Sequence, residues 1–173
     1  HTYLEISKAD VILTFFGANE AWDNNPSDYG TKLGKWVDDT LTKKYNGQSA
    51  PVIVLFSPIA HENLNSPDFP DGKKQNEKLK EIAEATAKVA KEKKLEYVDL
   101  FAASQKLYQE NQSSGGSRGD PSNSHSPLTI NGIHLSSNGN DLLSRVIHKA
   151  LFGKDAPVKH AHVKQTKEAI LNK

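Results

Sequence analysis

A histidine in a polar, glycine-containing loop is the residue of this chain that most favours a catalytic interpretation. His134 lies within residues 127–139, after a segment rich in Ser, Gly and Pro and before a helical pattern. A loop anchored to a rigid element is a common mounting for a general base. Three residues upstream, Asn131 can accept a hydrogen bond from the imidazole Nδ1–H, although it carries no charge. Because a lone loop histidine is more often structural or solvated, the rest of the chain must decide.

A second polar side chain suited to ester chemistry follows the first apolar run of the sequence. Asn19 belongs to the turn-prone residues 17–22, directly after residues 11–16. Its amide can donate a hydrogen bond to a developing oxyanion, an interaction that contributes about 3–4 kcal/mol in hydrolases. The alternative, in which the Asn19 side chain caps its own loop as an Asx-turn, is equally compatible with the spacing.

The composition argues against several classes of function. The chain has 22 Lys and Arg residues against 21 Asp and Glu, so its net charge of +1 offers no electrostatic footprint for nucleic acid. The absence of cysteine excludes disulfides, thiolate nucleophiles and cysteine-based zinc sites. The longest apolar runs are about six residues, far shorter than a membrane span. We therefore expect no nucleic-acid partner and no membrane-spanning segment.

The histidines near the end of the chain do not predict a metal site. His160 and His162 are two residues apart, so they point to different faces of a helix, and no carboxylates lie beside them. No glycine-rich loop joins a strand to a helix in the way that phosphate- and dinucleotide-binding folds require. We therefore expect neither a metal nor another cofactor.

Alternating strand and helix patterns predict an α/β domain. Continuous apolar runs, typical of strands buried on both faces, and apolar stripes at helical spacing follow one another along the chain. The predicted strands are residues 11–16, 52–56 and 96–100, and the predicted helices are residues 28–45, 74–93, 101–110 and 142–153. Strands that alternate with helices of this length pair in parallel through right-handed crossovers. We expect a three-layer α/β/α sandwich with a parallel sheet.

The remaining segments suggest how the domain is bounded. Residues 112–126 are rich in Ser and Gly, cannot bury a core, and are expected to form a mobile loop or a lid. We assign residues 1–153 to one domain and residues 154–173 to a basic linker helix that leads out of it. The first strand pattern begins soon after His1, so the sequence reads as part of a longer protein.

The carboxyl edge of the predicted sheet is where a ligand is expected to bind. In open α/β sheets, ligands lie beyond the carboxyl ends of the strands. Three polar segments are expected at this edge, namely residues 17–22, residues 57–62 and the loop with His134. Asn19 should therefore lie at the same edge of the sheet as His134.

Two of these segments resemble motifs of the SGNH (GDSL-type) hydrolases. Gly17-Ala18-Asn19-Glu20 resembles the family's Gly-x-Asn-Asp motif, and Asn131-Gly132-Ile133-His134 resembles its Asp-x-x-His motif. The motifs occur in the family's order over roughly residues 10–153. The resemblance implies a flavodoxin-like fold, with Asn19 in the oxyanion hole and His134 as the general base of a serine esterase. The resemblance favours a bacterial protein outside the cytoplasm without fixing its location. Residues 56–62 and 167–173 also resemble a branch found in multidomain proteins of planctomycete-type bacteria.

Departures from the family pattern bear on catalysis. No Gly-Asp-Ser block, which carries the family's nucleophile, occurs in these 173 residues, so the resemblance covers the C-terminal part of such a domain. Glu20 stands where the family usually has Asp. Asn131 stands where the triad carboxylate is expected, and losing that charge from a fixed triad can cost about four decades in kcat. Another carboxylate or a backbone carbonyl would then have to hold His134.

Two functions from different classes follow from this pattern. In the first, the parent protein is an acyl or acetyl esterase whose serine nucleophile lies outside this chain, and this chain alone is inactive. In the second, the same scaffold is a non-catalytic module that binds a carbohydrate or an acylated ligand, which the neutral Asn131 favours. Both predict ligand contacts from Gly17, Trp22 and His61, and a segment before residue 1 that completes the sheet.

Overall fold

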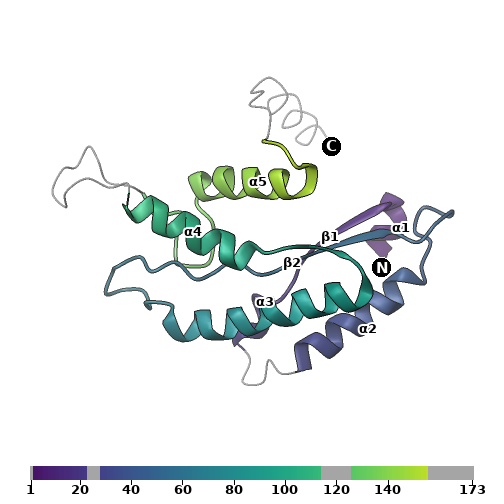
Figure 1. Cartoon of the computed structure of the whole chain (residues 1–173), viewed down its shortest axis with the longest axis horizontal. Helices are drawn as coiled ribbons and strands as arrows, with labels where there is room; N and C mark the ends of the chain where they lie inside the picture. The colour runs from purple at the N-terminus through teal and green to yellow at the C-terminus, as the bar shows by residue number, and fades with distance from the viewer. Residues whose placement is uncertain (1, 23–27, 114–125, 156–173) are drawn as a thin grey trace.

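A parallel three-stranded sheet forms the centre of the molecule (Figure 1). The structure is a computed structural model that describes residues 2–22, 28–113 and 126–155. The strands are Val11–Phe15 (β1), Val52–Phe56 (β2) and Glu96–Val98 (β3), in the order β1-β2-β3. All pairing is parallel, so the carboxyl ends of the strands lie at one edge. The parallel sheet and the α/β class expected from the sequence are confirmed.

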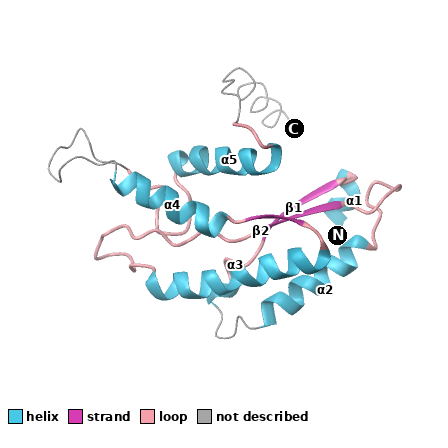
Figure 2. Cartoon of the chain, viewed as in Figure 1, coloured by secondary structure: helices cyan, strands magenta, loops and turns pink. Residues whose placement is uncertain are grey.

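Helices cover both faces of the sheet, as Figure 2 shows. Their bounds are Thr2–Ser7 (α1), Tyr29–Leu41 (α2), Lys73–Lys93 (α3), Leu100–Ser113 (α4) and Ser137–Phe152 (α5), with a 3-10 helix at Glu20–Trp22 (η1). α2 and α3 lie side by side against one face, whereas α5 lies over the other (Figure 1). The molecule therefore has the three layers of an α/β/α sandwich.

The alternation of side chains along β2 produces two separate cores. Ile53 and Leu55 point to the side of α2 and α3 and belong to the larger core. Val54 and Phe56 point to the opposite side and join a smaller core with Leu143 of α5. Because successive residues of a strand face opposite sides, a strand that is apolar throughout must be covered on both faces. β2 meets this condition as the central strand.

The N-terminus of α5 is fixed directly after the loop that carries His134. The Ser136 hydroxyl accepts a hydrogen bond from Gly139 N–H at 3.1 Å, which caps the first turn of the helix. Gly139 has no room for a side chain, because a Cβ there would lie 2.0 Å from the Leu128 carbonyl oxygen. This close approach anchors the helix start to the strand-like segment that precedes the loop.

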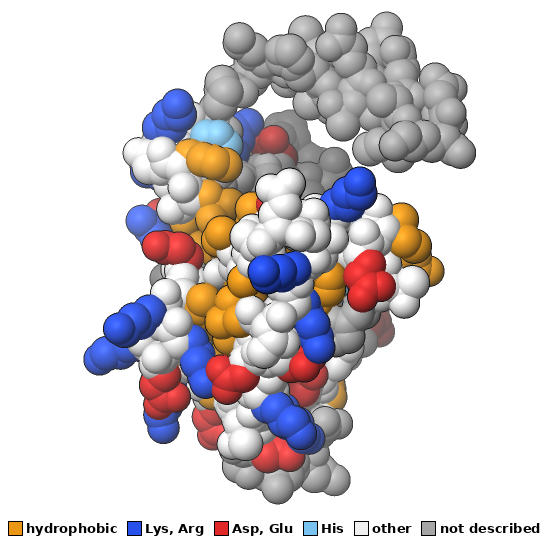
Figure 3. Space-filling view, turned by 90° about the vertical axis from the view of Figure 1, so that its right-hand side faces the viewer, with side chains coloured by type: hydrophobic (Ala, Val, Ile, Leu, Met, Phe, Trp, Pro, Cys, Tyr) orange, Lys and Arg blue, Asp and Glu red, His pale blue; other side chains and the backbone are white. Residues whose placement is uncertain are grey.

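The first strand differs from its prediction because one of its faces is open. Val11, Leu13 and Phe15 are 54, 44 and 55% exposed, although the apolar run predicts burial on both faces. Leu13 pairs with Val54 and Phe15 with Phe56, so the open side of β1 is the side on which α5 lies. α5 covers β2 and leaves the edge strand β1 uncovered. Figure 3, which views the molecule from the side of α1, shows hydrophobic side chains exposed among charged ones.

Helix α2 is shorter than its apolar pattern predicts. The stripe predicts a helix to residue 45 closed by Gly47, but α2 ends at Leu41. After Leu41, the N–H groups of Thr42 and Lys43 donate to the carbonyls of Asp39 and Thr40, three residues earlier, and the Thr42 hydroxyl also donates to the Asp39 carbonyl. The helix therefore ends in a tight turn at Thr42, and Asn46 accepts from Gln48 and Ser49 N–H in a separate turn beyond it. Most of the Ser/Gly segment 112–126 and most of the linker 154–173, with His160 and His162, lie outside the described residues.

Candidate functional site

The loop with His134 is closed by its own backbone hydrogen bonds. Ile130 N–H donates to the His134 carbonyl at 2.8 Å, and Ser136 N–H donates to the Leu128 carbonyl at 2.8 Å. An antiparallel bridge between Thr129 and Leu135 lies between these two hydrogen bonds. The segment is therefore a short hairpin-like loop that presents His134 just before α5.

The Asn131 side chain orients the imidazole of His134. Its Oδ1 accepts hydrogen bonds from Ile133 N–H at 3.3 Å and His134 N–H at 3.0 Å, and it lies 3.1 Å from His134 Nδ1. The two backbone donors fix the amide orientation, because a flipped side chain would place its NH₂ against them. Oδ1 is an acceptor, so Nδ1 carries the proton and Nε2 keeps its lone pair. The exposed imidazole thus has the tautomer that a general base requires.

The loop after β1 holds Asn19 with its amide free. Gly17 begins this loop at φ +101°, and a Cβ at this position would lie 2.4 Å from Ile82 Cγ2, so the glycine is needed for the turn. Trp22 N–H donates to the Asn19 carbonyl at 2.9 Å. Within the described part of the chain, the exposed Asn19 side chain makes no hydrogen bond, so the Asx-turn alternative is not formed there.

A cavity is lined by residues next to Asn19 and His134, although neither of these two side chains lines it. It has a volume of about 340 Å³ and lies between the end of β1 and α5. Phe16 and Ala18 line it from the β1 side, and Leu135 and Asn140 line it from the side of the histidine loop. The sheet therefore brings the two segments to the same edge, around an apolar hollow that also includes Phe15, Ile59, Leu143 and Ile147.

Trp22 and His61 meet at a different cavity, at the beginning of α3. This cavity has a volume of about 430 Å³ and includes Gly72 and Lys73. Trp22 is 54% exposed, whereas His61 is 4% exposed and offers a ligand little surface. The His61 ring packs against Gly72 and Gly132, where an added Cβ would lie 2.4 and 2.1 Å from its atoms. Gly17 is buried, so a ligand contact from Gly17 would have to use its backbone.

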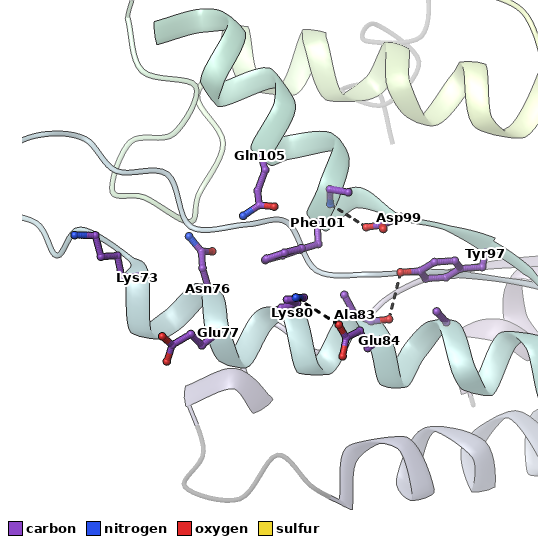
Figure 4. A pocket seen from close by; sticks show the side chains of 12 residues that line it. Lys73, Asn76, Glu77, Lys80, Ala83, Glu84, Tyr97, Asp99, Phe101 and Gln105 are labelled. Carbon is purple, nitrogen blue, oxygen red and sulfur yellow. Dashed lines mark hydrogen bonds and ion pairs between the residues drawn. The ribbon is translucent and has the colours of Figure 1, made fainter.

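A further cavity of about 760 Å³ lies between α3 and α4 (Figure 4). Phe101 points into it from α4, and the Tyr97 hydroxyl donates to the Ala83 carbonyl at 3.2 Å. Burial raises the pKa of Tyr97 above its ordinary value, so this phenol stays protonated at neutral pH. The cavity is lined by neither the Asn19 loop nor the His134 loop, and we do not assign it to the chemistry.

Sequence reasoning missed two residues beneath the histidine loop. Glu62 is 2% exposed and Thr129 is 3% exposed, and both belong to the hydrogen-bond network of this loop. Glu62 lies in the polar segment 57–62, which the sequence places at the carboxyl edge of the sheet. The missing signal is burial, because a carboxylate after a strand is ordinarily exposed.

Potential metal ligands do not cluster in the described part of the chain. Within residues 2–22, 28–113 and 126–155, no group of three or more His, Asp or Glu side chains could hold a metal ion. In the same part of the chain, no helix combines the length and apolarity needed to cross a membrane. The polar groups at the carboxyl edge can accept and donate protons and hydrogen bonds, which suits acyl transfer.

Comparison with protein families gives a match over most of the chain. The model of the GDSL-like Lipase/Acylhydrolase family matches residues 4–142, which include the segments of Asn19, Asn131 and His134. No curated protein matches the sequence significantly.

Solved structures of low sequence identity share the fold. A lipase/acylhydrolase from Enterococcus faecalis is 21% identical with a TM-score of 0.55, and the alignment covers 89% of this chain and 67% of that one. An acetylxylan esterase from Geobacillus stearothermophilus, crystallised as a catalytic mutant, is 17% identical with a TM-score of 0.57, covering 85% and 61%. A carbohydrate acetylesterase from Sinorhizobium meliloti is 22% identical with a TM-score of 0.54, covering 87% and 66%. The chain thus spans about 61 to 67% of the length of these structures.

Proposed function

We propose that this chain, which belongs to the GDSL-like lipase/acylhydrolase family, provides the general base and an oxyanion donor of a serine ester hydrolase. The observation that carries the proposal is the 3.1 Å contact between Asn131 Oδ1 and His134 Nδ1. The acceptor oxygen of Asn131 favours the neutral imidazole with its proton on Nδ1, in which Nε2 can accept a nucleophile's proton, and this supports the proposed role of His134. Ala18, next to Asn19, lines the same cavity as Leu135, next to His134, and this proximity supports the Asn19 amide as the donor for the oxyanion.

The reaction follows from these two groups and a serine contributed by a segment outside the 173 residues. The serine oxygen attacks the ester carbonyl while its proton passes to His134 Nε2, and the Asn19 amide donates to the developing oxyanion. His134 then gives this proton to the departing alkoxide, which leaves an acyl-serine. A water molecule, deprotonated by the same Nε2, hydrolyses the acyl-serine and returns the proton to the serine.

The apolar cavity beside these loops favours an ester with an apolar acyl group. Its lining by Phe16, Leu135 and Leu143 offers apolar contacts to such a chain. The structural neighbours named as acetylxylan esterase and carbohydrate acetylesterase support the same substrate class. We therefore propose an acetyl or short-acyl ester of a carbohydrate or other small molecule as the substrate.

The test uses the polypeptide in which this chain is preceded by its natural upstream sequence. The rate of p-nitrophenyl acetate hydrolysis by this polypeptide should fall at least 10³-fold in His134→Ala, because no general base then takes the serine proton. Only substrate binding and the oxyanion hole would support the rate that remains. His148→Ala is the matched control, since His148 lies on α5 and its Nδ1 contacts the Lys154 carbonyl. Hydrolysis that survives His134→Ala unchanged would refute the proposed role.

A second function, a non-catalytic binding module, is favoured by the neutral Asn131. The exposed Trp22 would then stack on a sugar ring at the cavity beside α3. Calorimetry with acetylated xylo-oligosaccharides separates the two functions. A binding module binds the intact ester without releasing acetate, loses affinity in Trp22→Ala and keeps it in His134→Ala.

A further inference from the structure

Glu62 is a buried carboxyl group directly beside the loop that carries His134. It ends the segment 57–62 after β2, and its exposed fraction is 2%. None of the ion pairs found among the described residues includes it. Burial of a carboxylate without a cation is unfavourable unless hydrogen bonds replace its hydration. Its neighbours must therefore supply several donors.

Three donors from the histidine loop converge on the two oxygens of Glu62. Leu128 N–H donates to Oε1 at 3.1 Å, and the N–H and hydroxyl of Thr129 both donate to Oε2 at 2.7 Å. The Thr129 hydroxyl in turn accepts from Gly132 N–H at 3.0 Å. The backbone N–H of Glu62 donates to the Gly132 carbonyl at 2.8 Å. Glu62 therefore holds both ends of the segment 128–132.

The residue before Glu62 links this network to a rigid helix. The His61 ring packs on Gly132, and its Nδ1 lies 3.0 Å from the Glu62 carbonyl oxygen. Asn76 of α3 donates to the His61 carbonyl at 2.9 Å and accepts from His61 N–H at 2.7 Å. Because α3 packs against the sheet, the segment that carries Glu62 is fixed relative to the core.

The network of Glu62 ends where the contact between Asn131 and His134 begins. Gly132, which Glu62 and Thr129 hold, lies between these two residues in the loop. We propose that Glu62 is a positioning residue for His134, whose carboxylate fixes the loop so that Asn131 meets Nδ1 and Nε2 faces the reacting serine. The inference rests on the proposed esterase function for its catalytic meaning. A displacement of about 1 Å in a catalytic group can cost on the order of 10²-fold in rate.

A carboxylate suits this position better than the amide of the same size. Glutamine has one acceptor oxygen, and its NH₂ group would face either Leu128 N–H or the N–H of Thr129. One buried donor would then lose its partner, and the loop would shift to relieve the contact. Glu62→Gln is therefore a nearly isosteric test of the carboxylate.

The first experiment measures the loop itself by NMR in the 173-residue chain, without any need for activity. In Glu62→Gln, amide hydrogen exchange at Leu128 and Thr129 should be about tenfold faster or more. The side-chain ¹⁵N chemical shifts of His134 should change from the values of a single Nδ1–H tautomer to those of a mixture of the two tautomers. Glu81→Gln, an exposed carboxylate on α3, is the control and should change neither. If Glu62→Gln leaves both the exchange rates and the tautomer unchanged, the inference is wrong.

A second pair of variants covers the case in which Glu62→Gln does not fold. Thr129→Val keeps the backbone N–H to Glu62 but removes the hydroxyl that joins Glu62 to Gly132. It should shift the His134 tautomer in the same direction, and Thr129→Ser should restore it. A purely structural role would lower Tm in Thr129→Val while leaving the tautomer as it is.

The third measurement ties the loop to catalysis in the polypeptide with its upstream sequence. Glu62→Gln should lower kcat by on the order of 10- to 100-fold, with KM changed less than about twofold, because the loss lies in the transition state. A loss confined to KM would overturn the positioning role. If the unaltered polypeptide does not hydrolyse esters, the proposed function fails, and the NMR result still decides the role of Glu62 in the loop.

Discussion

Asn131 accepts hydrogen bonds from two backbone N–H groups and from the imidazole of His134, all through one oxygen. An aspartate in the same place would keep these three contacts, since its carboxylate oxygen is an acceptor of the same geometry. It would add a negative charge about 3 Å from the imidazole, at the distance of the present contact of 3.1 Å. The amide therefore secures the tautomer and the orientation but gives no charge to stabilise the imidazolium.

The first prediction is that Asn131→Asp raises kcat in the polypeptide that contains the upstream sequence. The gain should lie between several-fold and several decades, because the added anion stabilises the imidazolium formed during acyl transfer. The acid limb of kcat/KM should move to higher pH, since protonation of the base becomes more favourable. Asn65→Asp, at an exposed position outside this loop, is the control. A slower variant would show that the added charge harms the loop more than it helps the base.

The second prediction concerns Asn19. Its side chain makes no hydrogen bond within the described residues and is exposed, so Asn19→Ala should leave Tm nearly unchanged. If its amide donates to the oxyanion, kcat should fall by about 10²- to 10³-fold. Steady-state kinetics and thermal unfolding are measured on the same variant. An unchanged kcat would remove Asn19 from the oxyanion hole, and a large loss of Tm would indicate a structural role instead.

The sequence predicts one part of the residue-scale geometry and misses another. The spacing of Asn131 and His134 within one short loop predicts that the amide reaches Nδ1, since the contact is local. The role of Glu62 depends on contacts with Leu128 and Thr129, which lie 66 and 67 residues further along the chain. No local pattern shows that a carboxylate after a strand will be buried by a distant loop, so this part of the site required the structure.

At the scale of elements, the turn after β1 depends on a glycine at a position where no other residue fits. Gly17 has φ +101°, and a Cβ would lie 2.4 Å from Ile82 Cγ2 in the core. We predict that Gly17→Ala destabilises the chain by roughly 1–3 kcal/mol, through backbone strain and crowding. The measurement is the free energy of unfolding in urea. If Gly17→Ala leaves the free energy of unfolding unchanged, the loop that carries Asn19 has room to adjust, and the explanation is wrong.

The matched control for this change lies in the middle of α2. Gly34 has no atom within 4 Å of an added Cβ. Gly34→Ala should therefore stabilise the chain by about 0.5–1 kcal/mol, because alanine loses less backbone entropy in a helix. A lower free energy of unfolding in Gly17→Ala together with a higher one in Gly34→Ala would confirm that the turn requires glycine at position 17. A loss of stability in both variants would contradict this explanation.

The elements themselves follow the sequence where the pattern is long and continuous. β2 has the predicted bounds 52–56, and α3 begins one residue before its predicted start and ends at the predicted residue 93. The end of α2 was predicted incorrectly, since the hydroxyl and the N–H of Thr42 both donate to the Asp39 carbonyl at the helix end, which the apolar stripe does not reveal. Side-chain hydrogen bonds to the backbone decide such boundaries, and periodicity does not record them.

At the scale of the whole molecule, the open face of β1 is the clearest departure from an ordinary α/β domain. We call the exposed side chains of Val11, Leu13, Phe15 and Val52 the open apolar face. β1 is also an edge strand in the described sheet, so apolar side chains and unpaired backbone groups coincide. Long apolar edges of this kind favour association with another strand or another chain. The open apolar face is therefore a surface at which another strand or a second copy of the chain can pair.

The last prediction tests this face on the 173-residue chain alone. Its weight-average mass in sedimentation velocity should rise above 19.0 kDa as the concentration increases, because the open apolar face pairs between copies. The double variant Val11→Thr with Leu13→Thr should stay monomeric, since threonine keeps strand propensity and removes apolar surface. Phe69→Thr is the control, because Phe69 is 41% exposed in a loop outside this face and its replacement should not change the association. A chain that stays monomeric at all concentrations, or one whose association responds to Phe69→Thr alone, would show that the open apolar face does not drive self-association.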